Sequence, residues 1–250
     1  MTGKRLSVLD NIRGFALLNM ILYHGIWNMV YLFGFHWNWF ESDIVYLWQQ
    51  GICWTFIFLS GFCQSLSRHK LKRGITVFFA GVLISIVTAV VIPEDRIMFG
   101  VLTLIGSCML LMIPLEKILK RCKPLIGLAV SIILFIITRN INDGFLGFEN
   151  WNIYKIPSNW YRNLATTYLG FPMYSFSSSD YFSLFPWIFL FIAGYFLFNF
   201  IKQKQLLHYL EAEGIKAIEW IGRHSLIIYL VHQPILYLIF FILLKCFRVI

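Results

Sequence analysis

Residues 9–31 read LDNIRGFALLNMILYHGIWNMVY, a run long enough to cross a bilayer as one helix. Four polar residues interrupt this apolar run, namely Asp10, Arg13, His24 and Asn28. A helix turns by about 100° per residue, so Arg13 and His24 point to within roughly 20° of the same direction. Asp10 and Asn28 extend the same stripe at its two ends. Ionisable groups inside a membrane are costly, and the stripe therefore indicates a protein-facing or wet functional site.

The composition places the chain among membrane proteins. It has 250 residues, of which 59% are hydrophobic and 13% charged, and a mean hydropathy of +0.71. These values exclude an ordinary soluble domain and predict one membrane-embedded domain over residues 1–250. The net charge of +9 is spread over short loops. Membrane insertion and anionic headgroups explain such a distribution better than nucleic acid does.

Hydropathy predicts an all-α bundle of seven transmembrane helices. The expected spans are roughly 12–34, 46–67, 74–92, 97–115, 124–141, 182–201 and 222–244. Of the 21 lysines and arginines, 15, including Lys4, fall on the N-terminal side of this arrangement, and Arg248 belongs to the minority on the other side. Positive loops stay in the cytoplasm, so we expect the N-terminus inside and the C-terminus outside.

Three connections stand out between the spans. Residues 35–43 (FHWNWFESD) are acidic and rich in Trp, which suits the outer membrane interface. Residues 142–181 are too aromatic for a disordered linker and predict a folded segment over the outer helix ends. Residues 202–220 mix lysines, glutamates and leucines and predict an amphipathic surface helix.

Two histidines could carry chemistry inside the membrane. His24 lies near the middle of its span, and Asn28 one turn later could fix its tautomer, so His24 is a candidate general base. On the last span, Tyr229 and His232 form a second polar stripe, with Pro234 expected to loosen the backbone behind it. By length, both histidines reach a similar depth and could line one cavity. Packing across helices explains the second stripe about equally well, whereas the polar neighbours of His24 on the first stripe favour a function there.

Other polar residues allow a functional and a structural interpretation. Ser60 and Gln64 could line a path for a cofactor, although close helix packing is the favoured explanation. Arg68 starts a basic run that could grip phosphates, but insertion topology already accounts for it. Asp180 is well placed to cap the sixth span, and Pro186 should kink that span.

Four stretches resemble one enzyme family. They are RLSVLDNIRGFALLNMILYHGIW (5–27), FIFLSGFCQSLS (56–67), SDYFSLFPWIFLFIAGYFLF (179–198) and IGRHSLIIYLVHQPIL (221–236). The chain is similar to bacterial relatives of heparan-alpha-glucosaminide N-acetyltransferase, within the integral-membrane acyltransferases. Many of these have an Arg followed, after ten residues, by an essential His, as in Arg13 and His24. Bacterial relatives often have Asp at the position of Asn28. In the animal members the His24 position is not His, and a loop His, here His36, is implicated instead.

The resemblance implies a multi-pass cell-membrane enzyme that takes an acyl group, expected to be acetyl, from cytoplasmic acyl-CoA. The acceptor would be an extracytoplasmic glycan or lipid-linked sugar. The other partners that come into question are membrane lipids and further copies of the chain, and neither a metal nor nucleic acid is expected. The candidate catalytic residues are His24, Asn28, His36 and His232. The candidate donor-site residues are Asp10, Arg13, Ser60, Gln64 and Arg68. The candidate acceptor-site residues are Asp180, Trp187 and Tyr229.

Two other functions compete with this interpretation. Intramembrane Arg and His residues are equally natural in a small proton-coupled transporter. Inverted repeats or paired broken helices would favour a carrier, and the sequence has neither. In a scaffold without catalysis the polar stripes would only pack helices, and loss of His24 would lower stability as much as activity.

Overall fold

The computed structural model describes residues 5–246 and divides the chain into two compact units. The first unit comprises Met1–Phe56 and Leu206–Ile250, and the second comprises Ile57–Gln205. The expectation of a single domain stays a prediction. Lys4 and Arg248, which entered the charge count, lie outside the described residues, and the predicted orientation stays a prediction too.

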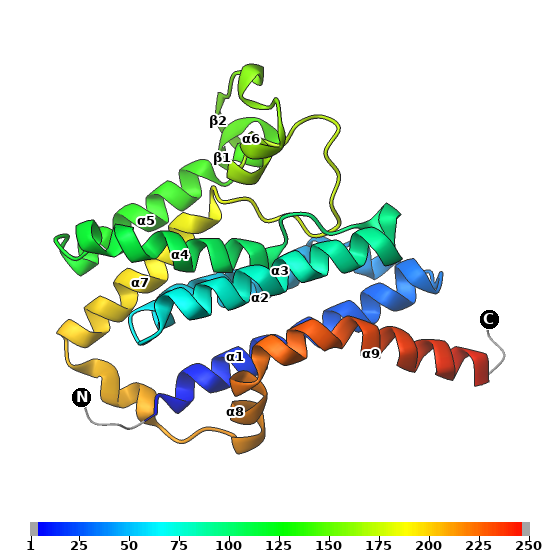
Figure 1. Ribbon diagram of the computed structural model, residues 1–250, viewed down its shortest axis with the longest axis horizontal. Coiled ribbons are helices and arrows are strands. Elements are labelled where there is room, and N and C mark those ends of the chain that lie inside the picture. Colours follow the sequence, from blue (N-terminus) through cyan, green and yellow to red (C-terminus); the bar gives the residue numbers. More distant parts are fainter. Residues whose placement is uncertain (1–4, 247–250) are drawn as a thin grey trace. The chain divides into compact units, whose positions relative to one another are not determined.

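All seven predicted spans coincide with helices (Figure 1). They are α1 (Ser7–Trp27), α2 (Asp43–Gln64), α3 (Lys70–Val91), α4 (Val101–Leu119), α5 (Pro124–Thr138), α7 (Trp187–Gln203) and α9 (Ser225–Cys246). Within the described part of the chain, five helices are long and apolar enough to cross a membrane. Helix α7 has 17 residues, and α2 falls outside the five because Asp43, Gln49 and Gln50 dilute its first half. The all-α membrane fold is therefore confirmed, whereas seven crossings are not established.

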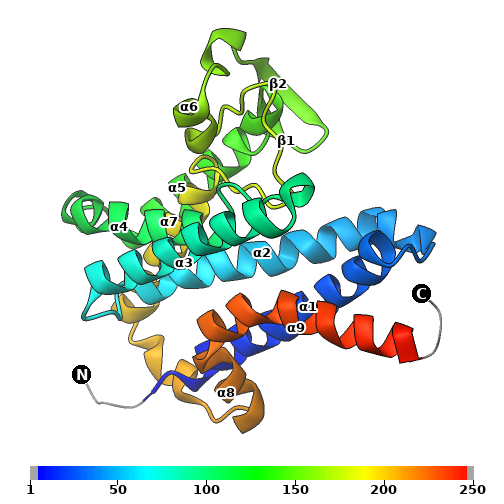
Figure 2. The same cartoon turned by 45° about the vertical axis from the view of Figure 1, so that its right-hand side comes forward.

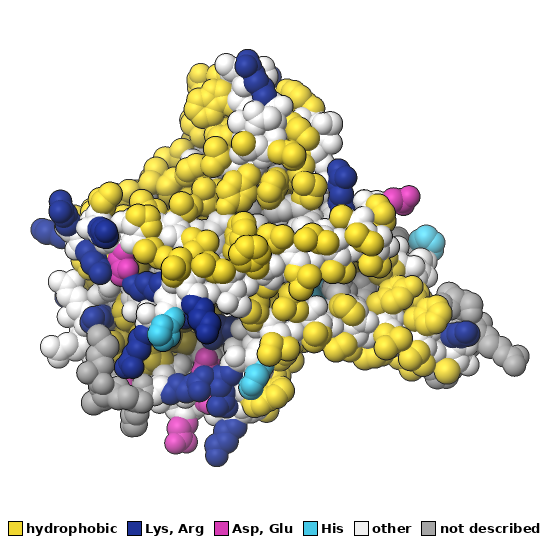
Figure 3. Space-filling model, in the orientation of Figure 1, with side chains coloured by type: hydrophobic (Ala, Val, Ile, Leu, Met, Phe, Trp, Pro, Cys, Tyr) yellow, Lys and Arg dark blue, Asp and Glu magenta, His cyan; other side chains and the backbone are white. Residues whose placement is uncertain are grey.

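Hydrophobic side chains cover much of the surface, as a lipid environment requires (Figure 3). On α3, Phe79, Ile86 and Val90 are exposed by 61%, 58% and 76%. Helix α9 exposes Ile227 and Leu238 in the same way. In a soluble protein such apolar faces would be covered by a partner, and here they are suited to lipid tails.

The first unit is built around α1, with α8 (Lys216–Arg223) and α9 packed beside it (Figures 1 and 2). Gly14 makes the approach of α8 possible, because a Cβ atom at this position would lie 2.1 Å from the carbonyl oxygen of Ile218. The core of this unit contains Leu17, Met20 and Ile52, all less than 9% exposed. A π-helical turn, η1 (Asn28–Leu32), continues α1 and leads to the 3₁₀ turn η2 (Asn38–Glu41).

The prediction of one continuous surface helix over residues 202–220 is wrong. A 3₁₀ segment, η6 (Leu206–Glu211), follows α7, and α8 begins only at Lys216. Gly214 lies in the break, where its backbone N–H donates to a carboxylate oxygen of Glu219 at 3.3 Å. The amphipathic character is nevertheless concentrated in α8, which lays its apolar side on α1.

The second unit pairs α3 with α4 and α5 with α7, and the last turns of α2 join it. Gly61 of α2 allows close packing, because a Cβ atom there would lie 1.9 Å from the carbonyl oxygen of Phe191. The expected kink at Pro186 is wrong: α7 begins at Trp187, so Pro186 precedes the helix instead of interrupting it. Proline is tolerated at this position because the first helical N–H groups have no partner within the helix.

The aromatic connection after α5 is folded, as predicted. The turn η4 (Ile141–Asp143), strands β1 (Phe145–Phe148) and β2 (Trp151–Lys155), the turn η5 (Ser158–Trp160) and the short helix α6 (Leu164–Leu169) form a lobe. The two strands are antiparallel, and Ile141, Ile156, Tyr161 and Phe171 form a small core beneath them. Burial of the Tyr161 hydroxyl, which donates to the carbonyl oxygen of Ile141 at 2.7 Å, raises its pKa to about 12.

Candidate active site

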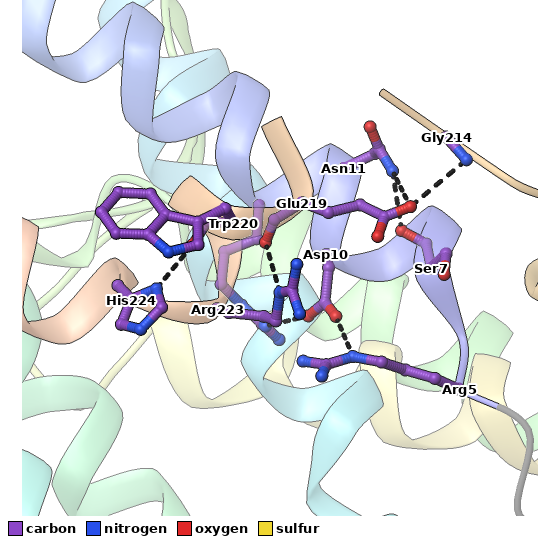
Figure 4. A network of polar contacts seen from close by, with 10 residues as sticks. Arg5, Ser7, Asp10, Asn11, Gly214, Glu219, Trp220, Arg223 and His224 are labelled. Atoms are coloured by element: carbon purple, nitrogen blue, oxygen red, sulfur yellow. Dashed lines mark hydrogen bonds and ion pairs between the residues drawn. The ribbon is translucent and has the colours of Figure 1, made fainter. Parts of the chain in front are cut away.

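The first polar cluster lies at the N-terminal end of α1 (Figure 4). Asp10 is only 7% exposed. Its Oδ2 accepts a hydrogen bond from Arg5 Nε at 2.7 Å, and its Oδ1 accepts one from an Arg13 guanidinium nitrogen at 3.1 Å. Both carboxylate oxygens are therefore engaged by cations, which satisfies the charge that burial would otherwise destabilise. The structure brings Asp10 and Arg13 together as the sequence predicted.

The same end of α1 holds the loop before α8 (Figure 4). Asn11 donates from Nδ2 to the carbonyl oxygen of Ser7 at 3.0 Å and to Glu219 Oε1 at 3.3 Å. Its Oδ1 accepts from the backbone N–H of Ile215 at 3.0 Å. These contacts join α1 to residues more than 200 positions away, and sequence periodicity does not reveal them.

Farther along α1, two side-chain amides and an imidazole form a continuous chain of hydrogen bonds. Asn28 is 0% exposed and donates from Nδ2 to Gln233 Oε1 at 3.0 Å. Gln233 Nε2 lies 3.2 Å from His24 Nδ1. Asn28 and His24 are thus brought together as predicted, but through Gln233 of α9 instead of directly. Gln233, which the sequence analysis did not place among the candidate site residues, is the residue that joins them. Its position next to His232 was the available signal.

His232 lies beside His24, as the shared depth predicted. The centroids of the two rings are 5.0 Å apart. His232 Nδ1 lies 2.5 Å from the carbonyl oxygen of Tyr229, and because a carbonyl can only accept, this nitrogen carries the proton. His232 Nε2 then holds a lone pair, which is buried and has no partner among the described residues. Tyr229 contacts His232 in two ways, because its backbone carbonyl accepts from Nδ1 and the centroids of the two rings are 5.4 Å apart.

His36 lies in a pocket of about 200 Å³ at the end of η1, away from the amide chain. The pocket is lined by Val30, Tyr31, Phe35, His36, Trp37, Asn38 and Glu41. Within residues 5–246, neither a hydrogen bond nor a ring contact joins His36 to His24. The loop is fastened to α1 by Phe40, which is 4% exposed and whose ring centroid lies 5.3 Å from that of Tyr23.

In the second unit, Gln64 is the predicted donor-site residue with the most unusual surroundings. It is 0% exposed, and its Nε2 donates to the carbonyl oxygen of Met109 at 2.9 Å. Its Oε1 has no partner in the described part of the chain, and neither have the hydroxyls of Ser65 and Ser67. Three unpaired oxygens at one helix end form a cluster of acceptors that a polar ligand could satisfy.

The other predicted donor-site residues of this unit are less distinctive. Ser60 is half-buried next to the close packing at Gly61. Arg68 is exposed in the loop that precedes α3. The basic neighbour Lys70 forms an ion pair with Glu116 of α4, so part of this basic run is engaged in structure.

Asp180 and Trp187 were predicted to contact the acceptor. The expectation that Asp180 caps α7 is wrong: its Oδ2 accepts from the backbone N–H of Val101 at the start of α4, at 3.4 Å. Burial raises the pKa of Asp180 to about 6, and the Val101 N–H offsets part of that effect. Trp187 is 3% exposed, with ring centroids of Phe182 and Phe135 at 5.0 and 5.6 Å. Contact with an acceptor stays a prediction for both residues.

The comparisons with known proteins add one match. The family model for heparan-alpha-glucosaminide N-acetyltransferase, catalytic, matches residues 5–234. This range contains the two polar clusters of α1, the His36 pocket and the pair His232–Gln233. Neither the curated proteins nor the solved structures show a significant similarity.

Proposed function

Because the chain belongs to the heparan-alpha-glucosaminide N-acetyltransferase catalytic family, we propose that it transfers an acetyl group from acetyl-CoA to a hydroxyl or amine of a glycan or lipid-linked sugar. Membership of the family supports a membrane-embedded acyltransferase. The observation that carries the finer proposal is the part-buried chain of Asn28, Gln233 and His24, which gives α1 and α9 an oriented imidazole. His24 is the general base in this proposal, with His232 as its neighbour.

The residues present fit the chemical groups of an acyl-CoA. Arg5 is 57% exposed while its Nε is held by Asp10, so its guanidinium can face a phosphate. Arg13, bound to the same carboxylate, adds a second positive charge to this end of α1. In the second unit, the unpaired oxygens of Gln64, Ser65 and Ser67 suit amide N–H groups of the kind that a pantetheine chain carries. The fit concerns chemical type and charge.

The transfer requires one proton to leave the acceptor. His24 takes the proton from the acceptor hydroxyl or amine while the oxygen or nitrogen of the acceptor attacks the thioester carbonyl. The carbon–sulfur bond breaks, and the thiolate of CoA leaves and is protonated. In the alternative mechanism with a covalent step, the imidazole first attacks the thioester carbonyl and displaces the CoA thiolate. The acetyl group then passes from the imidazole to the acceptor. On the acceptor side, the His36 pocket is the proposed contact of the first unit.

A direct assay tests the proposal. The purified protein in lipid nanodiscs is incubated with radiolabelled acetyl-CoA and a panel of amino sugars and lipid-linked sugars, and free CoA and labelled product are measured. We expect CoA release that depends on an acceptor and disappears in His24→Gln. Proton flux in proteoliposomes without any CoA release would instead favour the transporter.

The two-sided scheme requires a particular topology, which cysteine labelling tests. In a background in which the five native cysteines are replaced, we expect single cysteines to react only from the cytoplasm at Lys70, Lys120 and Lys204, and only from outside at Ser42 and Ser158. Reaction of any of the first three from outside would overturn the delivery of the donor from the cytoplasm.

A further inference from the structure

The amide of Gln233 lies between two groups that can each reverse their hydrogen-bonding role. On one side, Asn28 Nδ2 donates to Gln233 Oε1 at 3.0 Å. On the other side, Gln233 Nε2 faces His24 Nδ1 at 3.2 Å. An amide nitrogen can only donate, so in this arrangement His24 Nδ1 is the acceptor. Neutral His24 then carries its proton on Nε2, which cannot take up another.

The chain can also run in the opposite direction. Rotating both amides by half a turn exchanges an oxygen and an NH₂ group of nearly equal size. His24 Nδ1–H would then donate to Gln233 Oε1, and Gln233 Nε2 would donate to Asn28 Oδ1. In the described residues Asn28 Oδ1 has no partner, so the rotation breaks no other side-chain hydrogen bond of Asn28. In this direction His24 presents a lone pair on Nε2, as a base requires.

His232 provides an internal contrast to His24. Its Nδ1–H donates to the carbonyl oxygen of Tyr229, and a backbone carbonyl cannot become a donor. Only one neutral tautomer is therefore compatible with the contacts of His232. The two neighbouring imidazoles differ in this respect, because His24 faces a reversible amide and His232 a fixed carbonyl.

We propose that Gln233, supported by Asn28, is a positioning residue that sets the tautomer of His24 and accepts its Nδ1–H while Nε2 takes the proton of the acceptor. The proposal rests on the role of His24 as base in the proposed function. It also explains how an Asn–Gln pair can orient a catalytic imidazole without a carboxylate. Gln233 Oε1 accepts the Nδ1–H both before and after Nε2 takes the proton, and the reversed arrangement holds the neutral tautomer that cannot act as a base.

The test combines a spectroscopic measurement with kinetics. Histidine labelled with ¹⁵N reports the tautomer of each ring from its two nitrogen shifts, and His24→Gln identifies the His24 signals. We expect Gln233→Met and Asn28→Leu to change the tautomer ratio of His24 and to leave His232 in the Nδ1–H form. In the acetyl-transfer assay, Gln233→Met should lower kcat by about 10- to 100-fold with KM within about twofold, and Asn28→Leu should lower it less.

Gln49→Met is the matched control, because it makes the same change in the first unit at a residue whose Oε1 accepts a hydrogen bond from Gln50 Nε2. It should alter neither the His24 signals nor kcat. An unchanged His24 tautomer in both Gln233→Met and Asn28→Leu would overturn the proposal, even if activity fell. A changed tautomer with normal kcat would overturn its catalytic part. If the wild-type protein transferred no acetyl group at all, the proposed function would fail. The ¹⁵N spectra would still test whether Gln233 and Asn28 set the tautomer of His24.

Discussion

Helix α1 carries two polar clusters that differ in how completely their polar groups are paired. At its N-terminal end, both oxygens of Asp10 receive hydrogen bonds from arginines, and both ends of the Asn11 amide are occupied. This cluster is charged and saturated. It joins α1 to α8 and the loop before it.

The cluster around His24 is neutral and incompletely paired. Asn28 Oδ1 and His232 Nε2 are buried and lack a partner within residues 5–246. Each unsatisfied buried polar atom costs about 1–3 kcal/mol. A packing role would have been served better by apolar side chains at the same positions. The difference teaches that completeness of pairing, more than the presence of polar residues in a membrane helix, separates an anchoring cluster from one that is ready to react.

The largest expected effect tests this distinction at His24. We expect His24→Ala to lower kcat by about 10²- to 10⁴-fold, the usual contribution of a general base, with a nearly unchanged unfolding temperature. His36→Ala should cost much less, because His36 lies in a separate pocket. Near-normal turnover of His24→Ala, together with a loss of several orders of magnitude in His36→Ala, would move the chemistry to that pocket. An equal loss of stability and activity in His24→Ala would instead support a scaffold.

The second prediction asks whether the saturated cluster also binds the donor. Arg13→Ala should weaken acetyl-CoA binding by about tenfold or more, because a charge-assisted hydrogen bond contributes about 1.5–3 kcal/mol. Arg68→Ala should change it little, since Arg68 is exposed and its basic neighbours can replace its charge. Calorimetric titration with acetyl-CoA measures both variants. Equal losses of acetyl-CoA affinity in Arg13→Ala and Arg68→Ala would show that the contact with the phosphates has been assigned to the wrong residue.

Much of the fold and half of the site follow from periodicity. The apolar runs gave seven helices, and helical spacing placed Asp10 beside Arg13 and His24 near His232. These relations are local, or they depend only on depth along parallel helices. Both kinds of relation can therefore be read from residue spacing in the sequence.

The remaining relations depend on how helices rotate against one another. Gln233 contacts His24 only because of the rotation of α9 about its own axis. Asp180 caps α4, which begins 79 residues earlier, instead of the next helix. Neither relation leaves a periodic signal. The sequence did not predict the break at Gly214 for another reason. The backbone N–H of Gly214 donates to the Glu219 carboxylate, and local helix propensity does not reveal this contact.

The third prediction uses Asp180, a charged group that is incompletely paired. Its pKa of about 6 lies above the ordinary value of 3.8, so the folded state favours the protonated form. This stabilisation is present below about pH 4 and is lost as the pH rises through 6. Between pH 4 and 7 the unfolding temperature should therefore fall more in the wild type than in Asp180→Asn. The corresponding difference in folding free energy is no more than about 3 kcal/mol. Parallel pH profiles would contradict the burial of this carboxyl.

The smallest expected effect concerns Asn11, in the saturated cluster. Asn11→Leu keeps a similar volume but removes the hydrogen bonds to Ser7, Glu219 and Ile215. Because these bonds are partly exposed, we expect a loss of only about 1–2 kcal/mol of folding free energy. Turnover per folded molecule should stay normal, because none of these groups contacts the imidazoles. Asn11→Asp keeps the acceptor for the Ile215 N–H but places a carboxylate against that of Glu219, so we expect it to lose no less stability.

The outcome at Asn11 decides whether the two clusters are independent. They lie on one continuous helix, so a disturbance at the α8 end could be transmitted along α1 to His24. In that case Asn11→Leu would lower kcat at an almost unchanged unfolding temperature, and the ¹⁵N signals of His24 would shift. The saturated cluster would then belong to the catalytic apparatus. Unchanged His24 signals, with a lower unfolding temperature, would confirm that full pairing marks an anchor.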